Sequence, residues 1–348
     1  MKFSDVLDIK NGRNQKQVEN PDGKYPIYGS GGVMGWADSY ICEAHTVVVG
    51  RKGTINNPIY VDRPFWNVDT AFGLVANRDV LLPKYLFYFC CNYDFEKLNT
   101  TVTIPSLTKS NLLNIEINVP SLEVQGQIVD RLDQVEDLIK MRKAQLQQLD
   151  QLVKSRFIEL FGDCVVNPKG WKTRCLEDIA EVGSSKRVFV EELKEVGIPF
   201  YRGTEIGALA EGKPITPELF ITPDHYESLC EATGRPMIGD LLMPSICPDG
   251  RIWVVNTDEP FYFKDGRVLW VHSISDSYNP VFLLYTLKDR IMSDYNSIAS
   301  GTTFAELKIF ALKKCRVFDV PLTIQNKFAT FVEQTDKLKY CGDLEVVA

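Results

Sequence analysis

Residues 119–125 read Val-Pro-Ser-Leu-Glu-Val-Gln, and residues 320–325 read Val-Pro-Leu-Thr-Ile-Gln. The two glutamines, Gln125 and Gln325, lie 200 residues apart, and each stretch leads into a segment with helical periodicity. Repetition at a fixed distance is the signature of a repeated structural unit. The sequence therefore predicts two globular units, each of which is followed by a helix.

Shorter matches upstream of the two junctions extend this repeat. Residues 25–29 (Tyr-Pro-Ile-Tyr-Gly) match residues 198–203 (Ile-Pro-Phe-Tyr-Arg-Gly). Further matches join residues 46–55 to 240–252, residues 65–69 to 261–265, and residues 82–86 to 279–283. Two copies of one unit predict that the protein makes one kind of contact at two places.

The bulk composition favours a water-soluble chain of two domains. The chain has 348 residues, of which 45% are hydrophobic, and no apolar run approaches the ~20 residues of a membrane span. The N-terminus has no apolar signal segment, and the nine cysteines show no CxxC spacing. We therefore expect a cytoplasmic protein with reduced cysteines, no membrane contact and no metal site.

Apolar residues recur at heptad spacing after residue 121. They predict one helix from Val124 to Phe161, about 57 Å long at about 1.5 Å per residue. A shorter helix, about 25 Å long, is predicted from Ile324 to Tyr340. The predicted packing residues are Ile128, Leu132, Val135, Ile139, Leu146, Leu149, Val153, Phe328, Val332 and Leu338. An antiparallel coiled coil of these two helices would cover less than half of the first helix.

The predicted fold class is α+β, with two globular mixed α/β domains separated by the long helices. Strands are expected at residues 46–49, 59–61, 241–243, 252–255 and 268–271, and a short helix at residues 81–91. The predicted parts are a first domain (1–120), a central helix (121–161), a second domain (162–320), a distal helix (321–341) and a tail (342–348).

Basic residues in glycine-rich turns are the candidate contacts to nucleic acid. Arg51-Lys52 lies between Gly50 and Gly53, and Arg251 follows Gly250 at the place that the sequence repeat matches. Arginine can bond a guanine edge through two parallel hydrogen bonds, and adjacent glycines let the backbone approach phosphates. The predicted DNA-binding residues are Ser30, Arg51, Lys52, Arg202, Arg251 and Arg267. For each residue, a solvated turn charge or a structural ion pair is the alternative interpretation.

Catalysis by the chain itself is not indicated. Tyr28–Gly32 and Asn57–Tyr60 resemble elements of an amino-methyltransferase, but too few residues separate them for that fold. No GxxxxGK[ST] loop is present, and three histidines without a nucleophile-elbow motif give little support for Ser-His-Asp or Cys-His catalysis. The net charge of −7 argues against a nucleic-acid binder when taken alone, although an acidic protein can carry a local basic face.

The two Val-Pro junctions, each with a glutamine and a following helix, resemble the DNA-specificity subunit of type I restriction–modification systems. Residues 161–163 (Phe-Gly-Asp) and 167–171 (Asn-Pro-Lys-Gly-Trp) resemble the join between its halves, and residues 50–53 (Gly-Arg-Lys-Gly) resemble one of its loops. The resemblance implies that each globular unit is a target-recognition domain for one half of a split sequence in double-stranded DNA. The helices would space the two domains and dock two adenine methyltransferase subunits.

The same resemblance implies that cofactors belong to partner subunits. The methyltransferases would carry S-adenosylmethionine, and motor-nuclease subunits would use ATP and Mg²⁺ to translocate and cut unmodified DNA. This chain would bind no cofactor and would be no enzyme on its own. The alternatives that stay open are a two-headed protein-binding scaffold and a truncated, inactive specificity subunit.

Overall fold

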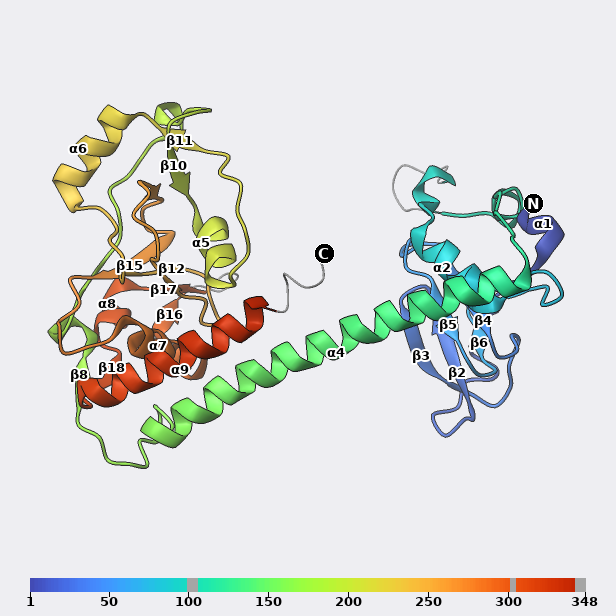
Figure 1. Cartoon of the computed structure of the whole chain (residues 1–348), viewed down its shortest axis with the longest axis horizontal. Coiled ribbons are helices and arrows are strands. Elements are labelled where there is room, and N and C mark those ends of the chain that lie inside the picture. The colour runs from blue at the N-terminus through green and yellow to red at the C-terminus, as the bar shows by residue number, and fades with distance from the viewer. Residues whose placement is uncertain (99–105, 301–304, 342–348) are drawn as a thin grey trace. The chain divides into compact units, whose positions relative to one another are not determined.

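The computed structural model of the chain describes residues 1–98, 106–300 and 305–341, and it separates into two compact units (Figure 1). We call Met1–Ala144 unit 1 and Gln145–Ala348 unit 2. The division falls within helix α4 (Leu122–Phe161), a continuous helix of 40 residues. The domain boundaries predicted from the sequence stay predictions, and the predicted tail lies outside the described residues.

Unit 1 is built from two small sheets and the helices that cover them. Its elements before α4 are α1 (Phe3–Val6), β1 (Leu7–Asn11), β2 (Tyr25–Gly29), β3 (Gly32–Ala37), β4 (Thr46–Gly50), β5 (Ile59–Val61), β6 (Trp66–Asn67), β7 (Ala71–Ala76), α2 (Pro83–Asn92), the 3-10 helix η1 (Phe95–Leu98) and α3 (Lys109–Leu113). The antiparallel sheet has the order β1-β7-β4-β5, and the second sheet has the order β3-β2-β6. Every residue of β4 is buried, as a continuous apolar run in a central strand predicts.

Unit 2 contains the second half of α4 and a larger set of elements. These are β8 (Thr173–Cys175), η2 (Leu176–Asp178), β9 (Glu181–Gly183), η3 (Val190–Glu192), β10 (Ile198–Tyr201), α5 (Gly203–Ala210), β11 (Phe220–Ile221), α6 (Pro223–Thr233), β12 (Leu241–Pro244), β13 (Trp253–Val254), β14 (Tyr262–Phe263), β15 (Val268–His272), α7 (Pro280–Ile298), β16 (Ala299–Ser300), β17 (Glu306–Leu307), α8 (Ile309–Lys313), β18 (Arg316–Phe318) and α9 (Leu322–Cys341). Its larger sheets have the orders β13-β12-β15-β9 and β11-β10-β14.

The strand pairing repeats between the units. In each unit a parallel pair joins the two segments that the sequence repeat matched, with the same register. The pairs are Ile27 with Trp66 and Tyr28 with Asn67 in unit 1, and Phe200 with Tyr262 and Tyr201 with Phe263 in unit 2. The antiparallel pair β4–β7 likewise has its counterpart in β12–β15. The predicted strands and the internal repeat are therefore confirmed.

Helix α9 runs antiparallel to the second half of α4 within unit 2 (Figure 1). The ring of Phe328, near the start of α9, lies 5.4 Å from that of Phe157, near the end of α4. At the other end of α9, the Lys339 ammonium lies 2.8 Å from the Asp150 carboxylate. The two helices have 40 and 20 residues, so the predicted inequality is confirmed, as is the α+β class with an antiparallel helix pair.

The predicted heptad seam is buried over only part of its length. Val153, Phe328 and Val332 are buried in unit 2, while Leu146 and Leu149 are half-buried. In unit 1, Ile128 is half-buried. The side chains that stay exposed are Leu132 (38%), Val135 (51%), Ile139 (48%) and Leu338 (60%). Packing of these four residues in a coiled coil therefore stays a prediction.

Within the described residues, no helix is long and apolar enough to span a lipid bilayer.

Candidate nucleic-acid interface

The end of strand β4 presents the cationic loop of unit 1. The Arg51 N–H donates to the Thr70 carbonyl at 2.7 Å, and the Arg51 carbonyl accepts from the Leu107 N–H at 2.9 Å. These bonds hold the backbone of Arg51 while its side chain is exposed, with the guanidinium 5.7 Å from the centre of the Phe72 ring. Lys52 is exposed beside it. The loop therefore offers two positive side chains on a fixed backbone.

The turn between β2 and β3 brings Ser30 to the same place. A Cβ atom added at Gly50 would lie 3.0 Å from the Ser30 Cβ and 2.0 Å from the Thr54 carbonyl oxygen. Only glycine at position 50 lets these three segments approach one another so closely. Ser30, Arg51 and Lys52 therefore lie close together in unit 1, and their contact with DNA stays a prediction.

The counterpart of Arg51 in unit 2 is Ser245, and here the sequence alignment of the repeat was wrong. The Ser245 N–H donates to the Arg267 carbonyl at 2.9 Å, and its carbonyl accepts from the Leu307 N–H at 2.7 Å. These are the bonds that Arg51 makes with Thr70 and Leu107. Arg251, which the sequence matched to Arg51, lies six residues further along the chain.

Arg267 supplies a positive charge at this place in unit 2. Its backbone stands where Thr70 stands in unit 1, and its side chain is 56% exposed. The guanidinium contacts the Glu306 carboxylate, which also pairs with Lys308 at 3.2 Å. In unit 1 the arginine at this place, Arg51, follows strand β4. In unit 2 the arginine, Arg267, comes instead from the segment that pairs with Ser245.

Arg251 lies against helix α5. A Cβ atom added at Gly207 would come within 2.8 Å of one guanidinium nitrogen of Arg251. The guanidinium pairs with Asp249 at 2.9 Å and lies 3.7 Å from Glu211. The sequence prediction named neither carboxylate as a partner of Arg251. Only Asp249 could have been found from the sequence, because a single glycine separates it from Arg251. The Arg251 side chain is thus held on α5 at a defined orientation.

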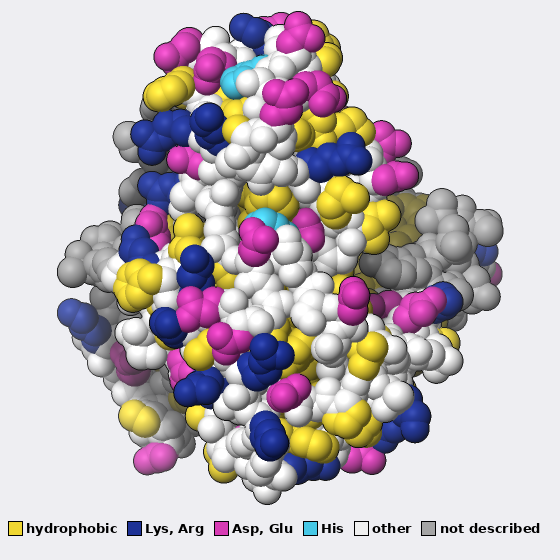
Figure 2. Space-filling model, turned by 90° about the vertical axis from the view of Figure 1, so that its left-hand side faces the viewer, with side chains coloured by type: hydrophobic (Ala, Val, Ile, Leu, Met, Phe, Trp, Pro, Cys, Tyr) yellow, Lys and Arg dark blue, Asp and Glu magenta, His cyan; other side chains and the backbone are white. Residues whose placement is uncertain are grey.

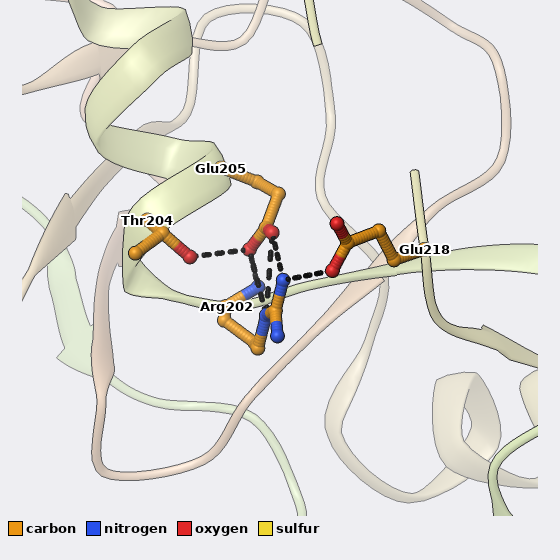
Figure 3. A network of polar contacts seen from close by, with 4 residues as sticks. All are labelled: Arg202, Thr204, Glu205 and Glu218. Carbon is orange, nitrogen blue, oxygen red and sulfur yellow. Dashed lines mark hydrogen bonds and ion pairs between the residues drawn. The ribbon is translucent and has the colours of Figure 1, made fainter. Parts of the chain in front are cut away.

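Arg202 begins the same helix and forms an ion-pair network with Glu205 and Glu218 (Figure 3). Two guanidinium nitrogens of Arg202 donate to the Glu205 carboxylate, at 2.5 and 3.2 Å, and one donates to Glu218 at 3.0 Å. The Arg202 N–H also donates to Glu205 at 2.8 Å, which caps the first turn of α5. This geometry favours the structural interpretation of Arg202.

The network lowers the pKa of the Glu205 carboxyl. Burial of its carboxyl opposes ionisation, but hydrogen bonds from the Arg202 guanidinium, from backbone N–H groups and from the Thr204 hydroxyl outweigh that effect. Together they lower the pKa of Glu205 to about 2. The carboxylate is therefore ionised at neutral pH and fixes the Arg202 side chain.

The two units thus differ in how their cations are neutralised. Arg202, Arg251 and Arg267 in unit 2 all pair with carboxylates. Among the residues that the structure describes, Arg51 and Lys52 have no carboxylate within ion-pair distance. On the face drawn in Figure 2, Lys and Arg side chains are interspersed with Asp and Glu side chains.

In the described ranges, no cluster of three or more His, Cys, Asp or Glu side chains could hold a metal ion.

Comparison with known proteins identifies the kind of protein to which these paired units belong. The family model for the type I restriction modification DNA specificity domain matches residues 1–151 and 168–340. A type I restriction enzyme specificity subunit of Haemophilus influenzae is 23% identical, over 91% of this chain and 81% of that protein. The type I restriction enzyme MjaIX specificity subunit of Methanocaldococcus jannaschii is 25% identical, over 82% of this chain and 68% of that protein.

Solved structures show the same fold. The S subunit of a type I restriction–modification system from M. genitalium aligns with a TM-score of 0.59 at 16% identity, over 100% of this chain and 91% of that one. A chain from a study of complex assembly and conformational transition of the type I R-M system aligns with a TM-score of 0.56 at 17% identity, over 98% and 90%. The chain therefore belongs to the family of type I restriction–modification DNA specificity subunits, with the specificity domain matched in each half of its sequence.

Proposed function

We propose that the chain reads a split DNA sequence, with unit 1 contacting one half-site and unit 2 the other. The observation that carries this proposal is the equivalent surface in each unit, formed where β4 and β12 end. Arg51, Lys52 and Ser30 line it in unit 1, and Arg267 lies at the corresponding place in unit 2. Arg251 extends the second surface along α5.

Direct base reading and phosphate contact are assigned to different residues. Arg51 and Arg251 are the proposed base readers. The backbone of Arg51 is held by hydrogen bonds, and the Arg251 side chain lies against α5, so each guanidinium is positioned to bond a base edge in the major groove. Lys52 is the proposed phosphate contact, since a flexible ammonium positions the protein without reading sequence. Arg202 is left with a supporting role in the orientation of α5.

The helices are the proposed docking platform for two adenine methyltransferase subunits. Leu132, Val135 and Ile139 expose a stripe along α4 within unit 1, and an exposed apolar stripe at heptad spacing is what a partner helix covers. In this proposal the methyltransferases hold S-adenosylmethionine, and motor-nuclease subunits hold ATP and Mg²⁺. The complex would act in the cytoplasm, which suits the free cysteines of the described residues.

The proposal is tested by binding of the assembled complex to DNA over a range of salt concentrations. Neutralisation of phosphates releases counterions, so the affinity for DNA with both half-sites should fall steeply as salt rises. DNA that carries one half-site should bind more weakly at every salt concentration. A complex that assembles but has no salt-dependent DNA affinity would support the alternative of a two-headed protein-binding scaffold.

A further inference from the structure

Gln125 is completely buried at the first turn of α4 and joins three segments of unit 1. Its side-chain oxygen accepts a hydrogen bond from the Leu82 N–H at 2.8 Å. Its side-chain nitrogen donates to the Val80 carbonyl and the Pro120 carbonyl, both at 2.8 Å. Leu82 is the residue that caps α2, so this one amide links the start of α2 to the start of α4.

Gln325 makes the same three bonds at the first turn of α9 and is also completely buried. It accepts from the N–H of Asn279 at 2.8 Å, and Asn279 caps α7. It donates to the Ser277 carbonyl at 3.0 Å and to the Val320 carbonyl at 2.8 Å. The arrangement in unit 2 thus reproduces that in unit 1, atom for atom.

The chemistry of these sites requires a primary amide of this length. Two carbonyls need two N–H donors, and one N–H needs an acceptor, on a single side chain. Glutamate lacks the donors when ionised, methionine has the size without the hydrogen bonds, and asparagine is shorter by one methylene. Because a buried carbonyl without a donor is costly, the amide resists any rotation of the globular unit about the start of its helix.

Other links between these helices differ from one unit to the other. In unit 1 the Tyr88 hydroxyl donates to the Asp133 carboxylate at 2.5 Å, and Lys84 pairs with the same carboxylate at 2.6 Å. In unit 2 the corresponding contact is aromatic, with the rings of Tyr285 and Phe328 5.1 Å apart. Of these three kinds of link, the glutamine bonds are the one that both units make.

We propose that Gln125 and Gln325 are positioning residues that set the number of base pairs between the two half-sites. The inference rests on the proposed function, in which the helices separate two DNA-reading surfaces. Each added base pair moves a half-site by about 3.4 Å and rotates it by roughly 34°. A unit that can tilt on its helix therefore accepts half-sites at more than one separation, although its base contacts are unchanged.

The test is methylation of a DNA library by the complete complex of this chain with its methyltransferase. The library carries the two half-sites at every separation around the preferred one. With wild type, one separation should dominate. With Gln125→Met or Gln325→Met, methylation at neighbouring separations should rise at least roughly tenfold. That is the change expected for one lost buried hydrogen bond, and each substitution removes three. The preferred bases within each half-site should stay the same. Gln127→Met, at an exposed position of the same helix, is the matched control and should match wild type.

Two results would overturn the inference: an unchanged separation profile in folded Gln125 and Gln325 variants, or a change of base preference within a half-site. If the methionine variants do not fold, Gln125→Asn keeps the primary amide but is shorter by one methylene, so it cannot reach all three groups and should broaden the profile in the same way. Failure of the proposed function is distinct, because the wild-type complex would then show no split target at all.

Discussion

Ser245 occupies in unit 2 the backbone position that Arg51 occupies in unit 1, with the same two main-chain hydrogen bonds to the segments on either side. The scaffold of the candidate DNA surface is therefore common to both units, whereas the side chain that points from it is not. A positive charge reaches the second surface from Arg267, which stands opposite Ser245. This arrangement lets each unit carry its own base preference on one shared backbone framework.

The first prediction separates base reading from phosphate contact in unit 1. Arg51→Ala should relax base preference in one half-site and cost about 1–3 kcal/mol of discrimination there, because a bidentate contact to a base is lost. Lys52→Ala should weaken binding to all sequences alike and lower the salt dependence by about one charge. Methylation profiles on half-site libraries and salt titrations measure both effects. Equal weakening by Arg51→Ala on every sequence would contradict its role in base reading.

The second prediction concerns the support of Arg251. Gly207→Ala places a methyl group within 2.8 Å of the Arg251 guanidinium, which is the flexible end of a long side chain. The arginine should therefore move, so that base preference changes in the half-site read by unit 2, while stability changes by less than about 1 kcal/mol. Arg251→Ala should alter the same half-site. If the two substitutions affected different half-sites, the placement of Arg251 at the DNA surface would be wrong.

The third prediction uses the acidity of Glu205. Its pKa is lowered from 4.5 to about 2, so its ionised form stabilises the fold above pH 4.5 and loses that contribution as pH falls toward about 2. Above about pH 5, Glu205→Gln should lower the free energy of unfolding by on the order of 2 kcal/mol relative to wild type. The difference from wild type should shrink as the pH falls from about 5 to about 2.

Urea unfolding of both chains at a series of pH values measures this difference. Glu218→Gln is the matched control, since Glu218 is 71% exposed and contacts the same guanidinium. A difference between wild type and Glu205→Gln that stays constant with pH would show that the ionised carboxylate does not stabilise the network around Arg202.

The fourth prediction concerns the cost of removing the buried amide at the junction. Gln125→Met should lower the free energy of unfolding by about 2–4 kcal/mol, because two carbonyls and one N–H lose their partner in a buried site. Gln127→Met should change it by less than about 0.5 kcal/mol, since that side chain is exposed. Similar values for the two variants in chemical unfolding would contradict the assignment of the three bonds.

The internal repeat made the fold predictable from the sequence. The Val-Pro junctions mark the starts of α4 and α9, and the apolar run before Arg51 is the buried strand β4. Helix α2 begins at Pro83 and α7 at Pro280, where proline is tolerated in the first turn. These features depend on local backbone preferences and hydrophobic periodicity, which a single sequence displays.

The site was less predictable, for reasons that particular residues illustrate. Arg251 was matched to Arg51 because both follow glycine-rich turns, whereas the main-chain bonds put Ser245 at that position. The partner of Arg267 is Glu306, which lies 39 residues away along the chain. Such pairings follow from strand register and loop path, and periodicity carries no information on them. The role of Gln125 was equally hidden, although its recurrence as Gln325 marked it as a position to examine.

The exposed part of the seam shows a further limit. Heptad spacing at Leu132, Val135 and Ile139 predicts that something packs there, but spacing does not say what. In unit 2 the residues of α9 at the places of Leu132 and Val135 are Val332 and Thr335, and both are buried. What packs on these three residues therefore stays a prediction.

The most direct test of the account is adenine-methylation mapping by long-read sequencing, in cells that express this chain with its neighbouring methyltransferase and in cells that lack this chain. The account predicts a split motif that is methylated only when the chain is present, with base preference relaxed in one half by Arg51→Ala and in the other by Arg251→Ala. No chain-dependent methylation, despite a stable complex, would contradict the central claim that the two units read DNA sequence.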